Sequence, residues 1–212
     1  MTFSYALLLG AFFLALLQCS VPLVGLHYQH PNWLRWLKPI SWSQFTFVAL
    51  GILSLAYAFL VNDFSFAYVA QNSNTHLPWF YRVCALWGGH EGSILLWVFI
   101  LNLWTVAVIV LNPSLQLADL ARIVAVLGFI SAGFLLFLLT LSNPFSLATE
   151  KLTDGRDLNP LLQDPGLIFH PPLLYMGYVG FSVSFAFAIA ALLSGRFDKQ
   201  SANRMRPWTL AA

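Results

Sequence analysis

The residue whose type and position best suit chemistry is a histidine between a polar stretch and an apolar one. His170 is followed by Pro171 and Pro172 and then by apolar residues as far as 193. Proline favours the first turn of a helix, so we expect His170 at or just before a helix N-terminus. That end of a helix disfavours the imidazolium and attracts anions. His170 is therefore a candidate neutral imidazole ligand for iron, and the alternative is a capping or loop histidine without a ligand.

A second candidate lies in a glycine-rich segment, Trp87-Gly-Gly-His-Glu-Gly-Ser93. The glycines allow a close backbone approach or unusual dihedral angles. His90 and Glu91 are candidates for a proton-sensitive pair, and the alternative is an imidazole bonded to a backbone carbonyl. His76 is interpreted as an ordinary loop residue. No metal site is predicted, since neither a CxxC pair nor a nearby third ligand for His27 and His30 is present.

The elements that must position these side chains are membrane helices. The chain has 212 residues, of which 59% are hydrophobic and 8% charged, whereas soluble domains carry about 25% charged residues. A soluble enzyme is therefore excluded. Five stretches have about the 20 apolar residues that a bilayer requires: 5–26, 40–61, 93–111, 122–141 and 172–193. Only helices satisfy their backbone groups in lipid without closing a barrel, so we predict an all-α, polytopic membrane helix bundle.

The cations predict how this bundle is oriented. Seven of the ten Lys and Arg residues lie in or beside 27–39, 112–121 and 194–206, and Arg82, Lys151 and Arg156 lie on the other side. The positive-inside rule then places the N-terminus and the loops 62–92 and 142–171 on the outer, non-cytoplasmic side of the membrane. A net charge of +2 disfavours nucleic-acid binding. The lack of an acid or base at mid-span argues against an ion-coupled transporter.

The end of the chain resembles the start of another span. An apolar stretch begins near 207 and stops at Ala212. Six residues are too few to cross a bilayer. We therefore expect 1–212 to be the N-terminal membrane domain of a longer protein, with five full spans and a truncated sixth.

Two segments carry a resemblance to a known family. One is Trp87-Gly-Gly-His-Glu-Gly-Ser-Ile-Leu-Leu-Trp97. The other comprises Asn143-Pro-Phe145, Asp154-Gly-Arg-Asp-Leu-Asn-Pro-Leu-Leu-Gln-Asp-Pro-Gly166 and His170-Pro-Pro-Leu-Leu-Tyr-Met-Gly-Tyr-Val-Gly180. Along essentially its whole length, the chain resembles the haem lyase subunits of bacterial cytochrome c maturation, which belong to the haem-handling membrane protein family.

The resemblance implies a multi-pass protein of the bacterial inner membrane. Such a protein receives haem from a periplasmic haem chaperone and joins its vinyl groups to the CxxCH thiols of apocytochrome c. Its implied partners are that chaperone, the apocytochrome, other cytochrome c maturation membrane subunits and lipid. His170 matches an axial ligand of the substrate haem b. The second periplasmic histidine, and the membrane histidines for a permanent b-type haem, would lie beyond Ala212, so we do not expect the chain alone to be a competent lyase.

Other side chains are secondary candidates, each with an alternative. Arg156 is a candidate contact for a haem propionate, because a guanidinium matches a carboxylate, and the alternative is pairing with Asp154 or Asp157. Trp87 and Trp97 are candidates for stacking on the porphyrin, and the alternative is an interfacial aromatic belt. No catalytic residue is predicted. The alternative functions are a haem-delivery or export subunit without lyase chemistry, and a non-haem membrane scaffold of a respiratory complex.

Overall fold

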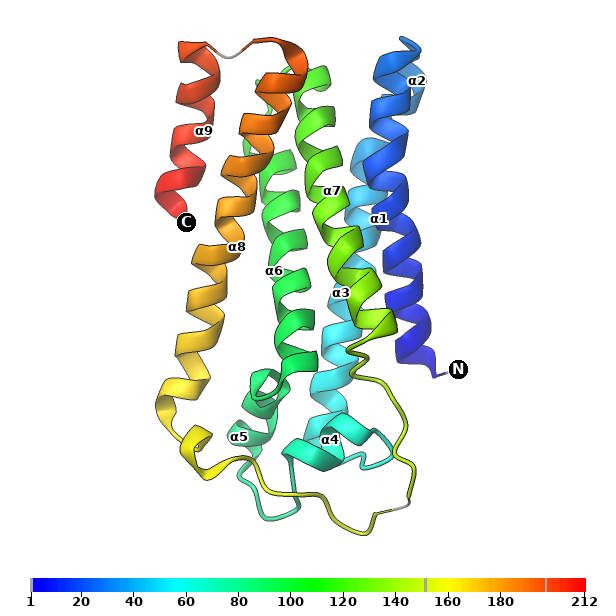
Figure 1. The fold of residues 1–212 in the computed structure, drawn as a ribbon, viewed down its shortest axis with the longest axis vertical. Coiled ribbons are helices and arrows are strands. Elements are labelled where there is room, and N and C mark those ends of the chain that lie inside the picture. The colour runs from blue at the N-terminus through cyan, green and yellow to red at the C-terminus, as the bar shows by residue number, and fades with distance from the viewer. Residues whose placement is uncertain (1, 151, 197) are drawn as a thin grey trace.

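Five long apolar helices run side by side through the molecule (Figure 1). A computed structural model describes residues 2–150, 152–196 and 198–212, so Lys151 lies outside the described residues. The long helices are α1 (Phe3–His27), α3 (Leu37–Leu60), α6 (His90–Leu111), α7 (Leu117–Thr140) and α8 (Pro165–Ser194). Each belongs to a helical segment long and apolar enough to cross a membrane. The predicted all-α bundle with five spanning helices is confirmed.

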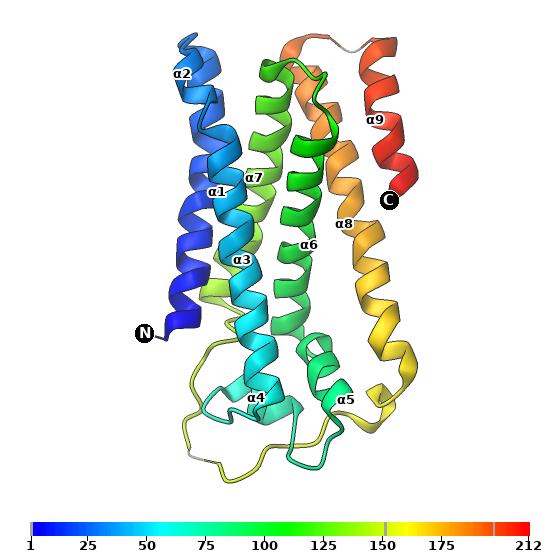
Figure 2. The same ribbon diagram turned by 180° about the vertical axis from the view of Figure 1, so that it is seen from behind.

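The connections give the molecule two different ends (Figures 1 and 2). We call the residues 62–89 and 141–164 the loop end; the N-terminus lies on that side of the bundle. The loop end contains α4 (Ala67–Asn72), α5 (Trp79–Cys84) and the short 3-10 helices η1 (Ala85–Trp87) and η2 (Pro160–Leu162). The opposite end holds α2 (Pro31–Leu34), the connection 112–116 and the start of α9 (Lys199–Ala211), which runs back along α8.

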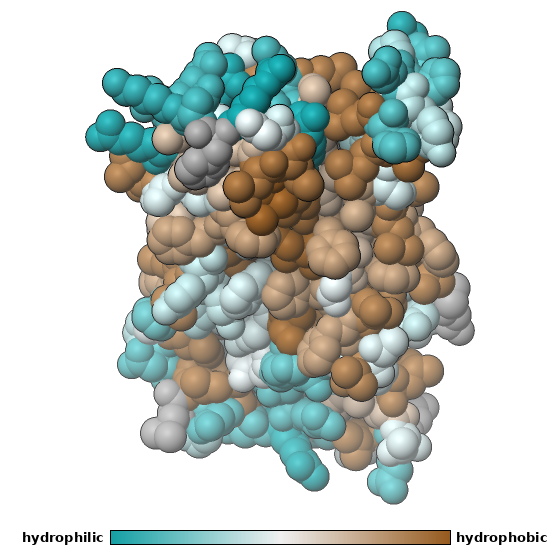
Figure 3. Space-filling view, turned by 45° about the horizontal axis from the view of Figure 1, so that its top comes forward, coloured by the Kyte–Doolittle hydropathy of each residue, from teal (hydrophilic) through white to brown (hydrophobic). Residues whose placement is uncertain are grey.

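The surface agrees with a membrane location for the middle of this bundle. Hydrophobic side chains cover the middle of the molecule, and hydrophilic side chains gather towards its ends (Figure 3). Several large apolar side chains of α8 are exposed there, among them Leu173 and Phe185. A band of exposed apolar surface between two polar ends is the form that a lipid bilayer requires.

Buried amide side chains join the spanning helices. Gln44 Nε2 of α3 donates to Ser131 Oγ of α7 at 2.7 Å, and Asn102 Nδ2 of α6 donates to the same hydroxyl at 3.2 Å. Gln18 Nε2 of α1 donates to the carbonyl of Val124 at 3.2 Å. Interhelical hydrogen bonds of this kind stabilise helix contacts in membranes, where the hydrophobic effect between helices is absent. Three helices are thus joined to α7.

The last helix begins earlier than the residues around 207 suggested. α9 begins at Lys199, because Asp198 caps it by accepting a hydrogen bond from the Ser201 backbone N–H at 2.8 Å. Pro207 therefore lies inside the helix. Trp208 packs against Trp104 of α6, with 6.0 Å between the ring centroids.

Candidate functional site

The glycine-rich segment before α6 is shaped by the packing of Tyr68. The Tyr68 hydroxyl donates to the carbonyl of Leu86 at 2.8 Å and accepts from the Gly89 backbone N–H at 3.1 Å. A Cβ on Gly92 would lie 1.6 Å from the Leu86 carbonyl oxygen. The close backbone approach expected from the glycines therefore occurs within the protein, between η1 and the first turn of α6.

His90 and Glu91 face different neighbours. The Nδ1 atom of His90 lies 2.8 Å from Ser142 Oγ, and its ring lies edge-on to Phe137 with 5.7 Å between centroids. His90 thus joins the start of α6 to the end of α7, with a hydroxyl in place of the expected carbonyl. Glu91 is half-buried near Tyr68 instead. Burial, followed by the charge of Glu91, raises the pKa of the Tyr68 phenol.

Asp154 fastens the two parts of the loop end together. Its carboxylate accepts from the Thr75 backbone N–H at 3.0 Å and from Thr75 Oγ1 at 2.8 Å. These hydrogen bonds lower the pKa of the Asp154 carboxyl. Asp157 accepts a hydrogen bond from Gln163 Nε2 at 3.3 Å. Both carboxylates therefore have neutral partners.

Arg156 is exposed at the same end of the molecule. Its backbone N–H donates to the carbonyl of Ala70 at 2.7 Å, which holds residue 156 against α4. The ion pairs within the described part of the chain both involve Asp119, at the opposite end. The alternative pairing of Arg156 with Asp154 or Asp157 is therefore not seen among these residues.

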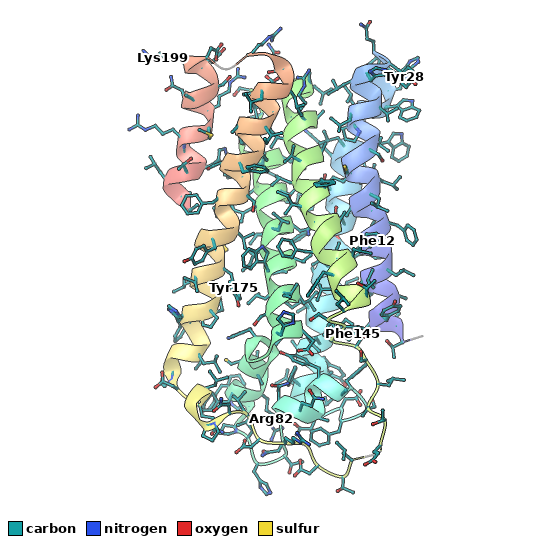
Figure 4. All side chains as sticks on the ribbon, viewed as in Figure 1. Phe12, Tyr28, Arg82, Phe145, Tyr175 and Lys199 are labelled. Carbon is teal, nitrogen blue, oxygen red and sulfur yellow. The ribbon has the colours of Figure 1, made fainter. Side chains whose placement is uncertain are left out.

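The other arginine of the loop end has a structural role. Arg82 Nε donates to the Leu77 carbonyl at 2.6 Å, and its guanidinium donates to the Thr75 carbonyl at 2.7 Å. Figure 4 shows Arg82 among the side chains of the loop end. Its hydrogen bonds to backbone carbonyls stabilise the turn around residues 75–77.

His170 does not lie at a helix N-terminus, and that expectation is wrong. α8 begins at Pro165, where Asp164 caps it by accepting a hydrogen bond from the Gly166 backbone N–H at 2.6 Å. An aspartate cap followed by proline is a strong start signal. His170 is consequently the sixth helical residue, and Pro171 follows it inside the helix. The macrodipole argument for a neutral imidazole does not apply, because the effect is confined to the first turn.

The side chain of His170 is nevertheless exposed, close to the loop end of α8. His76 is exposed in the connection before α5, where its backbone N–H donates to Asn74 Oδ1 at 3.0 Å. Within the described ranges, no group of three or more His, Cys, Asp or Glu residues is arranged to hold a metal ion. Of the three histidines near this end, His90 is bonded to Ser142 and the other two are presented outward.

The two candidate tryptophans both pack within the protein. Trp97 of α6 lies between Phe134 of α7 and Tyr175 of α8, with centroid distances of 5.5 and 5.7 Å. Figure 4 shows Tyr175 between α8 and α6. Trp87 Nε1 donates to the carbonyl of Leu167 at 2.7 Å. Both rings pack against buried apolar side chains of the bundle. Neither ring therefore presents a free face on the surface for stacking on a porphyrin.

The buried amide side chains that join the helices could have been found from the sequence. Gln18, Gln44 and Asn102 are strongly polar residues inside apolar stretches and are almost fully buried. They join helices and lie away from the loop end, so they belong to the scaffold of the site.

The fold and the site define a polytopic helical membrane protein with an ordered layer of loops and an exposed histidine near that layer. Residues 87–212 match the family model described as "Cytochrome C assembly protein". This match covers more than half of the chain and includes both the glycine-rich segment and His170. The chain belongs to the cytochrome c assembly protein family, and it is a multi-pass protein of the bacterial inner membrane.

Individual relatives agree with this assignment. The chain is 58% identical over 206 residues to "Cytochrome c-type biogenesis protein CcmF" of Pseudomonas aeruginosa, covering 97% of this chain and 31% of the relative. It is 56% identical over 200 residues to the protein of the same name from Escherichia coli K12, covering 94% and 31%. A solved structure of "Cytochrome c Heme Lyase CcmF" superposes on the whole chain with a TM-score of 0.84 and 29% identity, covering 34% of that protein. The chain therefore spans about a third of the length of these relatives.

Proposed function

We propose that this chain supplies a haem ligand, His170, to a cytochrome c haem lyase. In this proposal the protein takes haem from a periplasmic haem chaperone and attaches its vinyl groups to the CxxCH thiols of apocytochrome c. The observation that carries the proposal is the position of His170, exposed on α8 beside an ordered loop layer and inside the segment that matches the family model. The name of the solved structure, "Cytochrome c Heme Lyase CcmF", supports haem as the cargo.

The proposal also assigns the orientation of the bundle. The loop end faces the periplasm, and the N-terminus lies on the same side. The distribution of cations supports this, since seven of the ten Lys and Arg residues belong to segments at the opposite end. Cations accumulate on the cytoplasmic side of membrane proteins. His170 would then lie in the compartment where apocytochrome c receives haem.

The proposed reaction needs positioning more than proton transfer. Each thiol adds across one vinyl group: the sulfur bonds to the inner carbon, and the hydrogen goes to the terminal carbon, so no group leaves. The haem carries the reactivity, and the protein holds it by axial ligation. His170 would hold the iron. Arg156, exposed in the loop end, would contact a propionate through a charge-assisted hydrogen bond.

A permanent b-type haem does not fit the residues of this chain. Its five histidines all lie outside the central parts of the spanning helices. A buried haem at mid-membrane requires axial ligands there. We therefore assign no step to such a group and limit the proposal to the substrate haem.

The test is His170→Ala in the full chain, expressed in native membranes with an apocytochrome c reporter. Covalent haem on the reporter is measured by peroxidase staining, and the amount of inserted protein is measured alongside. We expect at least a tenfold loss of covalent haem at normal insertion, with partial recovery on addition of imidazole. His76→Ala is the matched control, because His76 is also an exposed histidine near the loop end, and we expect it to behave as wild type.

The other functions predict different outcomes. A haem-delivery subunit without lyase chemistry predicts that haem leaves the chaperone normally in the presence of the protein but that the purified full chain forms no thioether. A non-haem scaffold predicts normal covalent haem in His170→Ala. Wild-type levels of holocytochrome in that variant would overturn the proposal.

A further inference from the structure

The start of α8 contains a proline that deprives a carbonyl of its normal partner. In a helix, the backbone N–H of residue 171 would donate to the carbonyl of Leu167. Pro171 has no N–H, so this bond cannot form. The Trp87 indole takes its place: Nε1 donates to the Leu167 carbonyl at 2.7 Å. A side chain 80 residues away in the sequence thus completes the backbone hydrogen bonding of α8.

Trp87 is itself held firmly in place. Ser93 Oγ, in the first turn of α6, donates to the Trp87 carbonyl at 2.9 Å. The preceding residue, Leu86, accepts the Tyr68 hydroxyl at 2.8 Å. The indole ring also packs against buried apolar side chains of the bundle. The hydrogen bond to Leu167 therefore connects the start of α8 to the rigid start of α6.

The turn of α8 that Trp87 connects to α6 also carries His170. Leu167 precedes His170 by three residues, so the two lie on neighbouring positions of the same turn. Pro171 and Pro172 come next, and such prolines kink a helix and loosen the turn before them. Figure 1 shows the first turn of α8, in yellow, turned away from the axis of the rest of the helix. Without a second attachment, this turn depends on the Asp164 cap and on the packing of Leu167 and Ile168.

We infer that Trp87 is a positioning residue for His170: its indole N–H fixes the kinked start of α8 and thereby the place where the imidazole is presented. This inference rests on the proposed function of His170 as a haem ligand. Trp87 does not touch haem in this arrangement, because its N–H is already bonded to Leu167 and its ring packs in the core. Pro171 has a purpose in this reading, since it leaves the carbonyl of Leu167 for the indole.

The first test measures the attachment directly, without haem. Hydrogen exchange of the backbone amides of 166–170 is followed in the full chain in lipid nanodiscs. Trp87→Phe keeps an aromatic ring but removes the N–H. Losing one such hydrogen bond changes the equilibrium for local opening of the turn by about five- to tenfold. We expect these amides to exchange about five- to tenfold faster. Trp97→Phe is the matched control, because the buried Trp97 Nε1 has no partner among the described residues, and it should leave their exchange unchanged.

A second variant keeps the test informative if Trp87→Phe does not accumulate. Pro171→Ala restores a backbone N–H that can donate to the Leu167 carbonyl, so the indole becomes redundant. In that background, Trp87→Phe should accumulate and should exchange at the rate of Pro171→Ala alone. An unchanged exchange rate in Trp87→Phe, or no rescue by Pro171→Ala, would overturn the inference.

The link to haem is tested with the apocytochrome reporter. We expect Trp87→Phe to lower covalent haem at least fivefold at normal insertion, and Pro171→Ala to restore it in the double variant. Faster exchange with normal covalent haem would overturn the positioning role. The two proposals fail separately: normal holocytochrome in His170→Ala refutes the proposed function, whereas normal exchange in Trp87→Phe refutes the attachment.

Discussion

A methyl group at Gly92 should disrupt the structure that supports His170. The Cβ of alanine would lie 1.6 Å from the Leu86 carbonyl oxygen and 2.8 Å from the Tyr68 hydroxyl. An ordinary contact needs about 3.4 Å, so η1 would have to move by nearly 2 Å relative to α6. That movement would break the hydrogen bond from Tyr68 to Leu86 and displace Trp87. Overpacking costs about 1–3 kcal/mol and a lost buried hydrogen bond about 1 kcal/mol or more.

We therefore expect Gly92→Ala to destabilise the protein by about 3–4 kcal/mol. The assay is thermal unfolding of the detergent-purified full chain, followed by loss of the monodisperse peak in size-exclusion chromatography; we expect a fall in Tm of roughly 10 °C. Gly133→Ala is the matched control, because a Cβ on Gly133 meets nothing within 4 Å. Alanine is the better helix former, so this variant should be unchanged or more stable by about 0.5–1 kcal/mol. Equal stability of the two variants would refute the reasoning.

The remaining predictions concern three other parts of the molecule. Burial raises the pKa of the Cys84 thiol to about 11, so at pH 8 its alkylation by iodoacetamide should be about 100-fold slower than in the SDS-denatured chain; equal rates would contradict this. The hydrogen bonds from Thr75 lower the pKa of Asp154 in the folded state, so its contribution to loop stability is present above the carboxyl's ordinary pKa and is lost as the pH falls through the lowered value. After correction for the intrinsic pH dependence of amide exchange, the protection of the amides at 73–77 should therefore fall on acidification in the wild type, and a smaller fall is expected in Asp154→Asn. Gln44 donates to Ser131 while its buried Oε1 has no partner among the described residues, so Gln44→Leu should change the free energy of unfolding in SDS by less than about 1 kcal/mol; a loss above about 2 kcal/mol would contradict this.

The all-helical membrane fold was predictable because its cause is local. A stretch of about 20 apolar residues must be helical in lipid, whatever it packs against. α6 illustrates this: it was expected from 93 and runs from His90 to Leu111. Its three extra residues belong to the glycine-rich segment, where Gly89 adopts an extended conformation and His90 begins the helix.

The start of α8 was predicted wrongly for an identifiable reason. Two start signals lie six residues apart, Asp164-Pro165 and His170-Pro171, and both place a proline after a polar residue. The expectation placed the start of the helix at the later signal, because proline favours the first turn of a helix. The structure uses the earlier one and compensates for Pro171 with the indole N–H of Trp87. A donor from 80 residues away is invisible to any local pattern.

The sequence by itself determined the class of protein, the five spanning helices and the histidine that is the candidate ligand. These follow from composition, from apolar length and from residue types that act locally. Only the tertiary structure decided that His90 bonds to Ser142, that Asp154 joins Thr75 instead of Arg156, and that Trp87 bonds to Leu167. Each of these is a contact between residues more than 50 positions apart. Such pairings depend on how the helices pack, and the packing emerges from all of the chain's contacts together.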